Sequence, residues 1–144
     1  MTIPLWVLFA FALWTIAVLM AGVGLRRWSL ILTGRAQLTD FPADMPHGGP
    51  AYRRAMRAHA NCVENLPVYG ALVFVIFAAK MSAPILDTLA LVFITARIGQ
   101  SLVHMLFAES NVTVLVRFTL FFSQIVAMLW MAVEIINHAS PSGT

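Results

Sequence analysis

The chain has 144 residues, of which 60% are hydrophobic and 10% charged, with nine basic against six acidic side chains and a formal net charge of +3. Soluble domains carry about a quarter of their residues as charges, so this composition excludes an ordinary soluble domain and predicts a polytopic membrane protein. The basic residues lie beside apolar segments, so we expect them to reflect membrane topology rather than a nucleic-acid partner.

Four long apolar stretches predict four membrane-spanning helices, since one span needs about 20 residues. The first helix is expected over residues 3–34, where Gly34 offers a stop. A loop rich in proline and glycine follows, and it ends at His47-Gly48-Gly49-Pro50. The other helices are expected over residues 51–80, 85–107 and 112–137. The predicted fold is an all-α membrane protein, a four-transmembrane-helix bundle that forms one domain over residues 1–144.

Basic residues predict the orientation of the chain in the membrane. Only Lys80, with Asp87 nearby, stands at the turn between the second and third helices. Six arginines surround the first loop: Arg26, Arg27, Arg35, Arg53, Arg54 and Arg57. The positive-inside rule therefore places the first and third loops in the cytoplasm and both termini on the opposite side.

A polar stripe runs along the second helix. Arg57, Asn61 and Glu64 stand at i, i+4 and i+7, which places them on one side of a helix. Inside a membrane, each such group must find a polar partner or a water-filled cavity. The stripe therefore predicts a site for a small zwitterionic ligand.

The third and fourth helices carry polar stripes of their own. Arg97, Gln100 and His104 are spaced i, i+3 and i+7, and Arg117 stands seven residues before Gln124. An arginine at mid-helix costs about 2.5 to 3.5 kcal/mol on insertion scales, so a compensating interaction is expected. Two structural alternatives stay open: Arg97 pairs with Glu64 in the core, or Arg117 snorkels to lipid phosphate.

Metal binding and thiol chemistry of the protein itself are not expected. His59 and His104 have no second ligand at metal-binding spacing, so no metal site is predicted. The single cysteine, Cys62, is expected to pack as a small apolar residue. A transporter is disfavoured because the sequence has neither an inverted repeat nor a broken helix pair.

The second-helix motif resembles the MAPEG family, the membrane-associated proteins of eicosanoid and glutathione metabolism. The segment Arg57-Ala58-His59-Ala60-Asn61-Cys62-Val63-Glu64-Asn65-Leu66-Pro67 follows the family pattern R-A-x-x-N-x-x-E-x-x-P. His47-Gly48-Gly49-Pro50 looks like the segment before the second helix of microsomal prostaglandin E synthase, and Arg97 followed by Arg117 also fits. The resemblance covers about residues 5–137 and extends to the microsomal glutathione transferases.

The resemblance implies a homotrimer with glutathione as cosubstrate, bound between neighbouring subunits. By motif, Arg57, Asn61 and Glu64 would hold glutathione, and Arg117 would be the catalytic residue that activates its thiol. The weaker matches Arg35, Gln100 and His104 would complete the binding site. The thiolate would attack lipophilic electrophiles or peroxides delivered from the lipid bilayer.

Two functions follow from the resemblance. The first is a glutathione transferase-like enzyme or peroxidase. The alternative is a non-catalytic membrane protein of the same family that binds lipid or glutathione, or serves as a scaffold. Gln100 and His104 stand where family enzymes commonly have a His and a Tyr, and Phe118 stands in place of the serine of the prostaglandin synthase. These departures argue against a prostaglandin-type isomerase.

Overall fold

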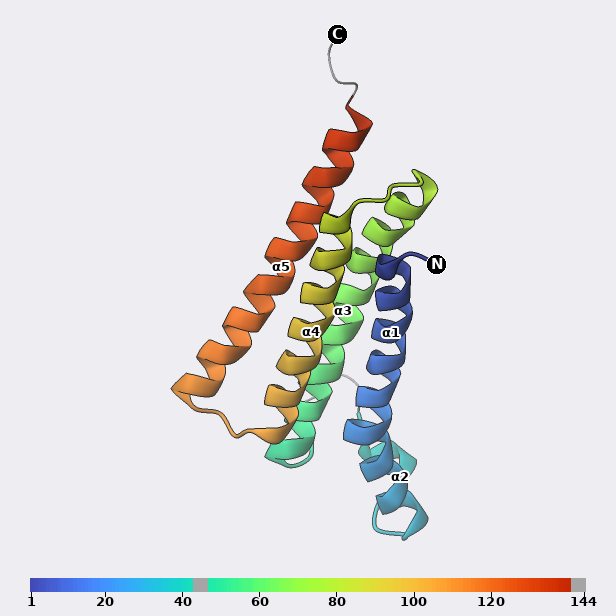
Figure 1. Ribbon diagram of the computed structural model, residues 1–144. Helices are drawn as coiled ribbons and strands as arrows, with labels where there is room; N and C mark the ends of the chain where they lie inside the picture. The colour runs from blue at the N-terminus through green and yellow to red at the C-terminus, as the bar shows by residue number, and fades with distance from the viewer. Residues whose placement is uncertain (43–46, 141–144) are drawn as a thin grey trace.

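The computed structural model describes residues 1–42 and 47–140 and shows a bundle of long helices (Figure 1). The first span is continuous over Ile3–Leu32 and consists of α1 (Ile3–Val18), the π-helical segment η1 (Leu19–Gly24) and α2 (Leu25–Leu32). A 3₁₀ turn, η2 (Leu38–Asp40), lies in the first loop. The other spans are α3 (Pro50–Ala78), α4 (Pro84–Leu106) and α5 (Asn111–Ala139).

The four expected helices are confirmed, with ends that differ by one or two residues. Within the described residues, four helices are long and apolar enough to cross a membrane. The chain is therefore an integral, multi-pass, all-α membrane protein. The π-helical segment was not predicted, because the first span is apolar on all sides, so a local change in the number of residues per turn leaves no mark on its sequence pattern.

Local residue chemistry sets where the helices begin. Pro4, Pro50 and Pro84 stand in the first turns of α1, α3 and α4, where a missing N–H costs nothing. The fourth span begins with a capping box, in which the Ser110 hydroxyl accepts a hydrogen bond from the backbone N–H of Thr113 at 3.2 Å.

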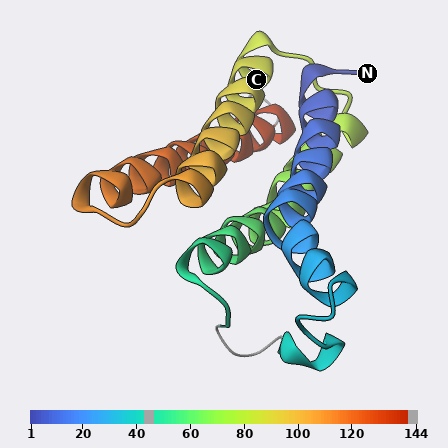
Figure 2. The same ribbon diagram turned by 90° about the horizontal axis from the view of Figure 1, so that it is seen from below.

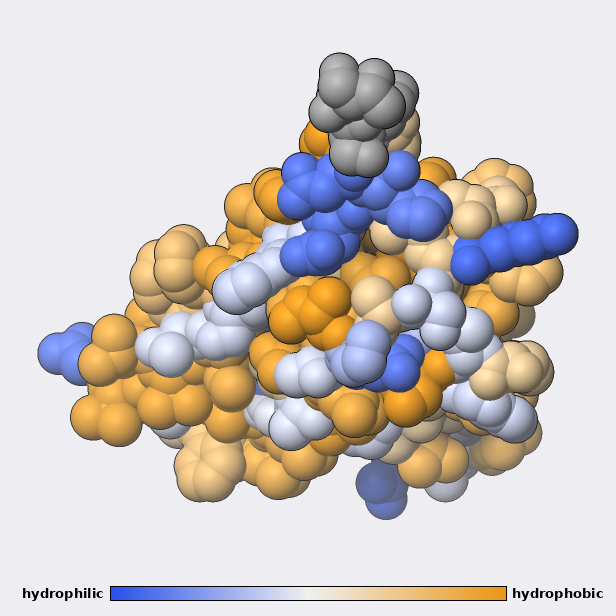
Figure 3. All heavy atoms as spheres, turned by 45° about the horizontal axis from the view of Figure 1, so that its top comes forward, coloured by the Kyte–Doolittle hydropathy of each residue, from blue (hydrophilic) through white to orange (hydrophobic). Residues whose placement is uncertain are grey.

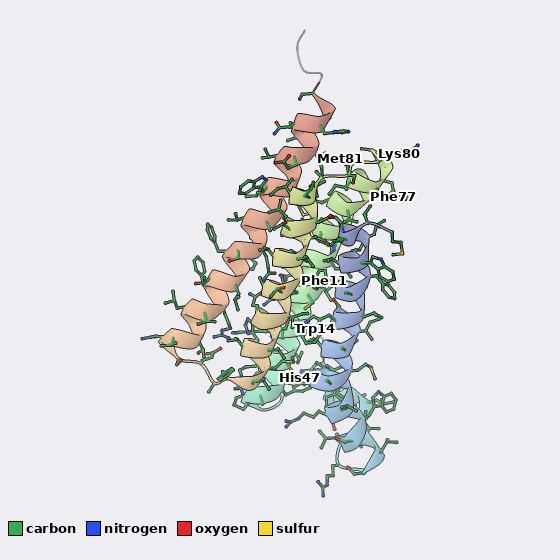
Figure 4. All side chains as sticks on the ribbon, in the orientation of Figure 1. Phe11, Trp14, His47, Phe77, Lys80 and Met81 are labelled. Atoms are coloured by element: carbon green, nitrogen blue, oxygen red, sulfur yellow. The ribbon has the colours of Figure 1, made fainter. Side chains whose placement is uncertain are left out.

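Two of the helices end at a residue whose backbone has the left-handed conformation. Gly34 (φ +68°) ends α2, and backbone bonds from Gly34 to Ile31 and from Arg35 to Leu30 satisfy the last carbonyls. This is why the first helix stops before the predicted residue 34. Lys80 (φ 53°) ends α3 in the same way, and Met81 folds back toward the bundle to bond Ile76, at the turn labelled in Figure 4.

An aromatic cluster joins three of the helices at mid-height. Phe11 of α1 is fully buried, with its ring centroid 5.2 Å from that of Phe93 on α4 in an edge-to-face arrangement. Phe93 in turn stacks on Tyr69 of α3, with centroids 4.2 Å apart. Figure 4 labels Phe11 between α1 and α4. Such pairs contribute about 0.5 to 1.5 kcal/mol each beyond area burial, so they fix how the helices rotate against one another.

The arrangement of the helices brings the first loop and the α4–α5 loop to the same end of the molecule. The N-terminus, the α3–α4 turn and the end of α5 lie together, while the first loop and the 107–110 loop lie at the other end (Figure 1). Seen from below, α5 packs along α4 and away from α1 (Figure 2). Hydrophobic residues cover most of the sides visible in Figure 3, and polar residues gather near the C-terminal end.

Candidate functional site

The polar stripes of α4 and α5 meet inside the bundle. Arg97, Gln100 and His104 of α4 are buried, with 0%, 4% and 9% of their surfaces exposed. On α5, Arg117 is 8% exposed and Gln124 is fully buried. Side chains this polar are tolerated between membrane helices only when they bond to one another. The packing of α4 against both α3 and α5 makes such bonding possible.

Gln100 is the centre of this network. Its side-chain oxygen accepts hydrogen bonds from Arg97 Nη1 at 3.0 Å and from Gln124 Nε2 at 3.1 Å. Its side-chain nitrogen donates to the backbone carbonyl of Arg117 at 3.4 Å. A guanidinium only donates and a carbonyl only accepts, so both ends of the Gln100 amide are fixed.

Arg97 is held by a neutral partner and an aromatic ring rather than by Glu64. Its guanidinium carbon lies 5.8 Å from the centroid of Phe11, within cation–π range. A direct core ion pair with Glu64 is not formed, because in residues 1–42 and 47–140 the only ion pair within 4.0 Å joins Arg57 to Glu109. Glu64 is exposed on the outside of α3.

His104 connects the stripe on α3 to Arg117. Nη1 of Arg117 lies 3.0 Å from Nδ1 of His104, and the other ring nitrogen, Nε2, lies 3.4 Å from the side-chain nitrogen Nδ2 of Asn61. One imidazole ring thus joins Asn61, which lies 43 positions from His104 in the sequence, to Arg117, which lies 13 positions from it. Sequence reasoning placed Asn61, His104 and Arg117 in one site, and the structure brings these three together.

The remaining predicted site residues lie outside this network. Arg57 is exposed and pairs with Glu109 in the α4–α5 loop, with 3.5 Å between Nη1 and Oε1. Arg35 lies exposed in the loop after α2, and in the described part of the chain its side chain has no hydrogen bond or ion pair with the other site residues.

An arginine-lined cavity of about 400 Å³ lies at the loop end of the bundle. Its walls include Arg53, Arg54 and Arg57 from the first two turns of α3, and Ala108 and Glu109 from the α4–α5 loop. Three cations against one carboxylate suit a ligand with anionic groups. Sequence reasoning missed Arg53, Arg54 and Glu109. The i, i+4 spacing of Arg53 and Arg57 was the available signal, whereas nothing local places Glu109 opposite them.

A larger groove of about 810 Å³ opens beside this cavity, between the first span, α3 and the end of α4. Gly22, Ala51 and Ala55 make its floor with small side chains, and Arg26 stands on its lining. Tyr52 of α3 holds the first span at the side of this groove, because it accepts a hydrogen bond from Arg27 and its ring lies beneath the guanidinium of Arg26. Within the described residues, no group of three His, Cys, Asp or Glu side chains is placed to hold a metal ion.

Comparison with known proteins agrees with the motif on α3. No curated protein and no solved structure matches the chain significantly. The sequence profile of the MAPEG family matches residues 4–137, which is nearly the whole chain. The match covers almost all of the four spans and includes the polar stripes and the aromatic cluster. The chain therefore belongs to the MAPEG family.

Proposed function

We propose that this protein is a glutathione-dependent membrane transferase or peroxidase. The observation that carries the proposal is the chain of contacts Asn61–His104–Arg117, which links the proposed ligand stripe to a guanidinium held in a fixed place. Family membership supports glutathione-related chemistry of this class. Arg117 would act on the thiol, and the α3 stripe would hold the tripeptide.

The arginine-lined cavity suits the charged ends of glutathione, which carries two carboxylates and one ammonium group. Arg57 would take a carboxylate, and Arg53, one turn earlier on the same wall, offers a second cation. Asn61 and Glu64 would hold the amide and ammonium groups. Because Glu64 is exposed on the outer face of α3, we expect a neighbouring subunit of a homotrimer to cover the bound ligand.

The chemistry requires a thiolate. A thiol with an ordinary pKa of about 8.5 is mostly protonated at neutral pH. A fixed guanidinium beside the sulfur favours the anion and lowers that pKa, and arginine keeps its charge throughout. The thiol proton leaves to water, and the thiolate then displaces a leaving group or opens a strained ring on a lipophilic electrophile, which forms a C–S bond.

A peroxide would react by a different route. The thiolate attacks the O–O bond, so an alcohol leaves and a sulfenic acid forms on glutathione. A second glutathione thiol then condenses with the sulfenic acid, giving the disulfide and water. The groove with small residues on its floor would admit the lipophilic substrate from the bilayer.

Thiolate absorbance tests the proposal directly. Glutathione is titrated at neutral pH into the purified protein in detergent, and the ultraviolet band of the thiolate is recorded. A thiolate band that rises and then saturates as glutathione is added, at a plateau proportional to the protein concentration, supports the enzyme. Burial of Arg117 to 8% exposure favours one alternative, a non-catalytic glutathione- or lipid-binding protein. Glutathione binding without the thiolate band would favour that alternative.

A further inference from the structure

The two ring nitrogens of His104 face different partners, and chemistry decides which nitrogen carries the hydrogen. Nδ1 lies 3.0 Å from Nη1 of Arg117. A guanidinium has five donors, no acceptor, and keeps its proton. Nδ1 must therefore accept, which makes the ring neutral with its hydrogen on Nε2.

This hydrogen sets the orientation of Asn61. The structure places the side-chain nitrogen Nδ2 of Asn61 3.4 Å from Nε2 of His104. Because Nε2 carries the hydrogen, it needs an acceptor, and in the Asn61 amide only the oxygen accepts. Oxygen and nitrogen of a carboxamide exchange places by a half-turn, so Asn61 turns its oxygen toward the ring. Its NH₂ group then faces away from His104, on the half-buried side of α3.

We propose that His104 is a positioning residue, which as the Nε2–H tautomer holds Arg117 through Nδ1 and turns the NH₂ group of Asn61 toward the ligand. The inference rests on the proposed function and adds to it. It assigns Asn61 as a donor to a carbonyl or carboxylate oxygen of glutathione.

The backbone beneath Arg117 is fixed by a second contact, so the histidine controls only the guanidinium end. Gln100 donates to the Arg117 carbonyl at 3.4 Å, and Gln100 is itself held by Arg97 at 3.0 Å. A change at position 104 should therefore release the tip of Arg117 without moving α5. This makes the role of His104 separable from that of the helix packing.

Two substitutions of similar shape separate the two contacts of the ring. In His104→Asn, the amide oxygen takes the place of Nδ1, so Arg117 keeps an acceptor and Asn61 loses its partner. We expect a wild-type thiolate band and glutathione binding weaker by about three- to tenfold, the loss of one neutral hydrogen bond.

In His104→Gln, the amide reaches the place of Nε2, so Asn61 is held and Arg117 is released. We expect near wild-type affinity and at least a threefold smaller thiolate band.

His138→Asn is the matched control, because His138 is exposed near the far end of α5. It should change neither the affinity nor the thiolate band. Equal loss of both quantities in His104→Asn and His104→Gln would overturn the proposal, since a merely structural histidine would give that pattern.

Nitrogen NMR of protein labelled at its histidines tests the tautomer without any glutathione. The His104 signals are assigned by their loss in His104→Asn. We expect a hydrogen-bearing Nε2 and a bare Nδ1, and a mixture of tautomers in Arg117→Leu. A hydrogen on Nδ1 in the wild type would overturn the proposal. A wild-type protein that forms no thiolate would contradict the proposed function instead. The tautomer measured by NMR would then still show whether His104 holds Arg117.

Discussion

Buried arginines in this protein are stabilised by neutral acceptors. Arg97 bonds Gln100 and lies over Phe11, and Arg117 bonds His104. A carboxylate partner would neutralise the charge, whereas an amide or imidazole leaves it able to act on a ligand anion. The residues that accept from the two guanidinium groups thus preserve a positive field in the site.

Replacing Arg117 tests that field. Arg117→Leu should keep most glutathione affinity, because the stripe on α3 is untouched. The pKa of the bound thiol should rise toward its ordinary value, so turnover at neutral pH should fall at least tenfold, about 1.4 kcal/mol for each pKa unit. Raising the pH should restore part of the rate, because hydroxide then removes the proton. Steady-state rates across pH measure this.

Arg117→Lys is the matched control for charge. It should recover only part of the rate, since an ammonium lacks the fixed planar fork. Wild-type rate and pH profile in the leucine variant would show that Arg117 serves only to pack α5 against α4 through its contact with His104.

The exposed pair of Arg57 and Glu109 places a competing carboxylate at the proposed ligand site. Arg57→Ala should weaken glutathione binding by about tenfold or more, the loss of a charge-assisted hydrogen bond of about 1.5 to 3 kcal/mol. Glu109→Gln should strengthen binding by a few-fold at most, because exposed pairs contribute roughly 0 to 1 kcal/mol. Calorimetric titration measures both. Weaker binding in Glu109→Gln would show that Glu109 contacts the ligand favourably.

Among the helices, the first span depends on small residues for its approach to α3. A Cβ added at Gly22 would lie 2.8 Å from the Cβ of Ala55, closer than real Cβ contacts allow. Gly22 lies within the π-helical segment, beside the groove. The close approach of the first span to α3 therefore occurs at the π-helical turn of that span.

Gly22→Ala should destabilise the protein by about 1 to 3 kcal/mol through overpacking. Gly70→Ala on α3 is the control, because its Cβ would lie 3.7 Å from the nearest atom, a side-chain carbon of Leu8. That change should be neutral or stabilising by up to about 1 kcal/mol, since alanine favours helix more than glycine does. Thermal unfolding in detergent compares the two variants. Equal stability would mean that η1 and α3 shift apart freely at Gly22.

For the whole molecule, we predict that the first and third loops face the cytoplasm. The structure places these loops at one end and the N-terminus and the end of α5 at the other (Figure 1), and the arginines gather at the loop end. Thr39→Cys should react with an impermeant thiol reagent only from the cytoplasmic face, and Ser82→Cys only from the opposite face. Reversed labelling would overturn the orientation.

We also predict a homotrimer, because Arg57 and Glu64 are exposed on a span that must otherwise face lipid. Native mass spectrometry at micromolar protein should show three subunits. Arg57→Ala and Glu64→Ala should leave the trimer intact if the stripe serves the ligand. Loss of the trimer in these variants alone would show that the stripe serves the structure. A monomeric wild type would show that the predicted homotrimer is wrong.

The sequence by itself determined the four spans, their spacing and which residues share a face of each helix. Hydrophobic length and the helical period are properties of one segment, and they placed Arg57, Asn61 and Glu64 on one stripe and Arg97, Gln100 and His104 on another. Only the tertiary structure decided which stripe meets which. Partner choice depends on how the helices rotate and cross, which is set by packing at distant residues such as the Phe11–Phe93 contact and the Gly22–Ala55 approach. That is why His104 was found between Asn61 and Arg117, and why Arg97 bonds Gln100 rather than Glu64.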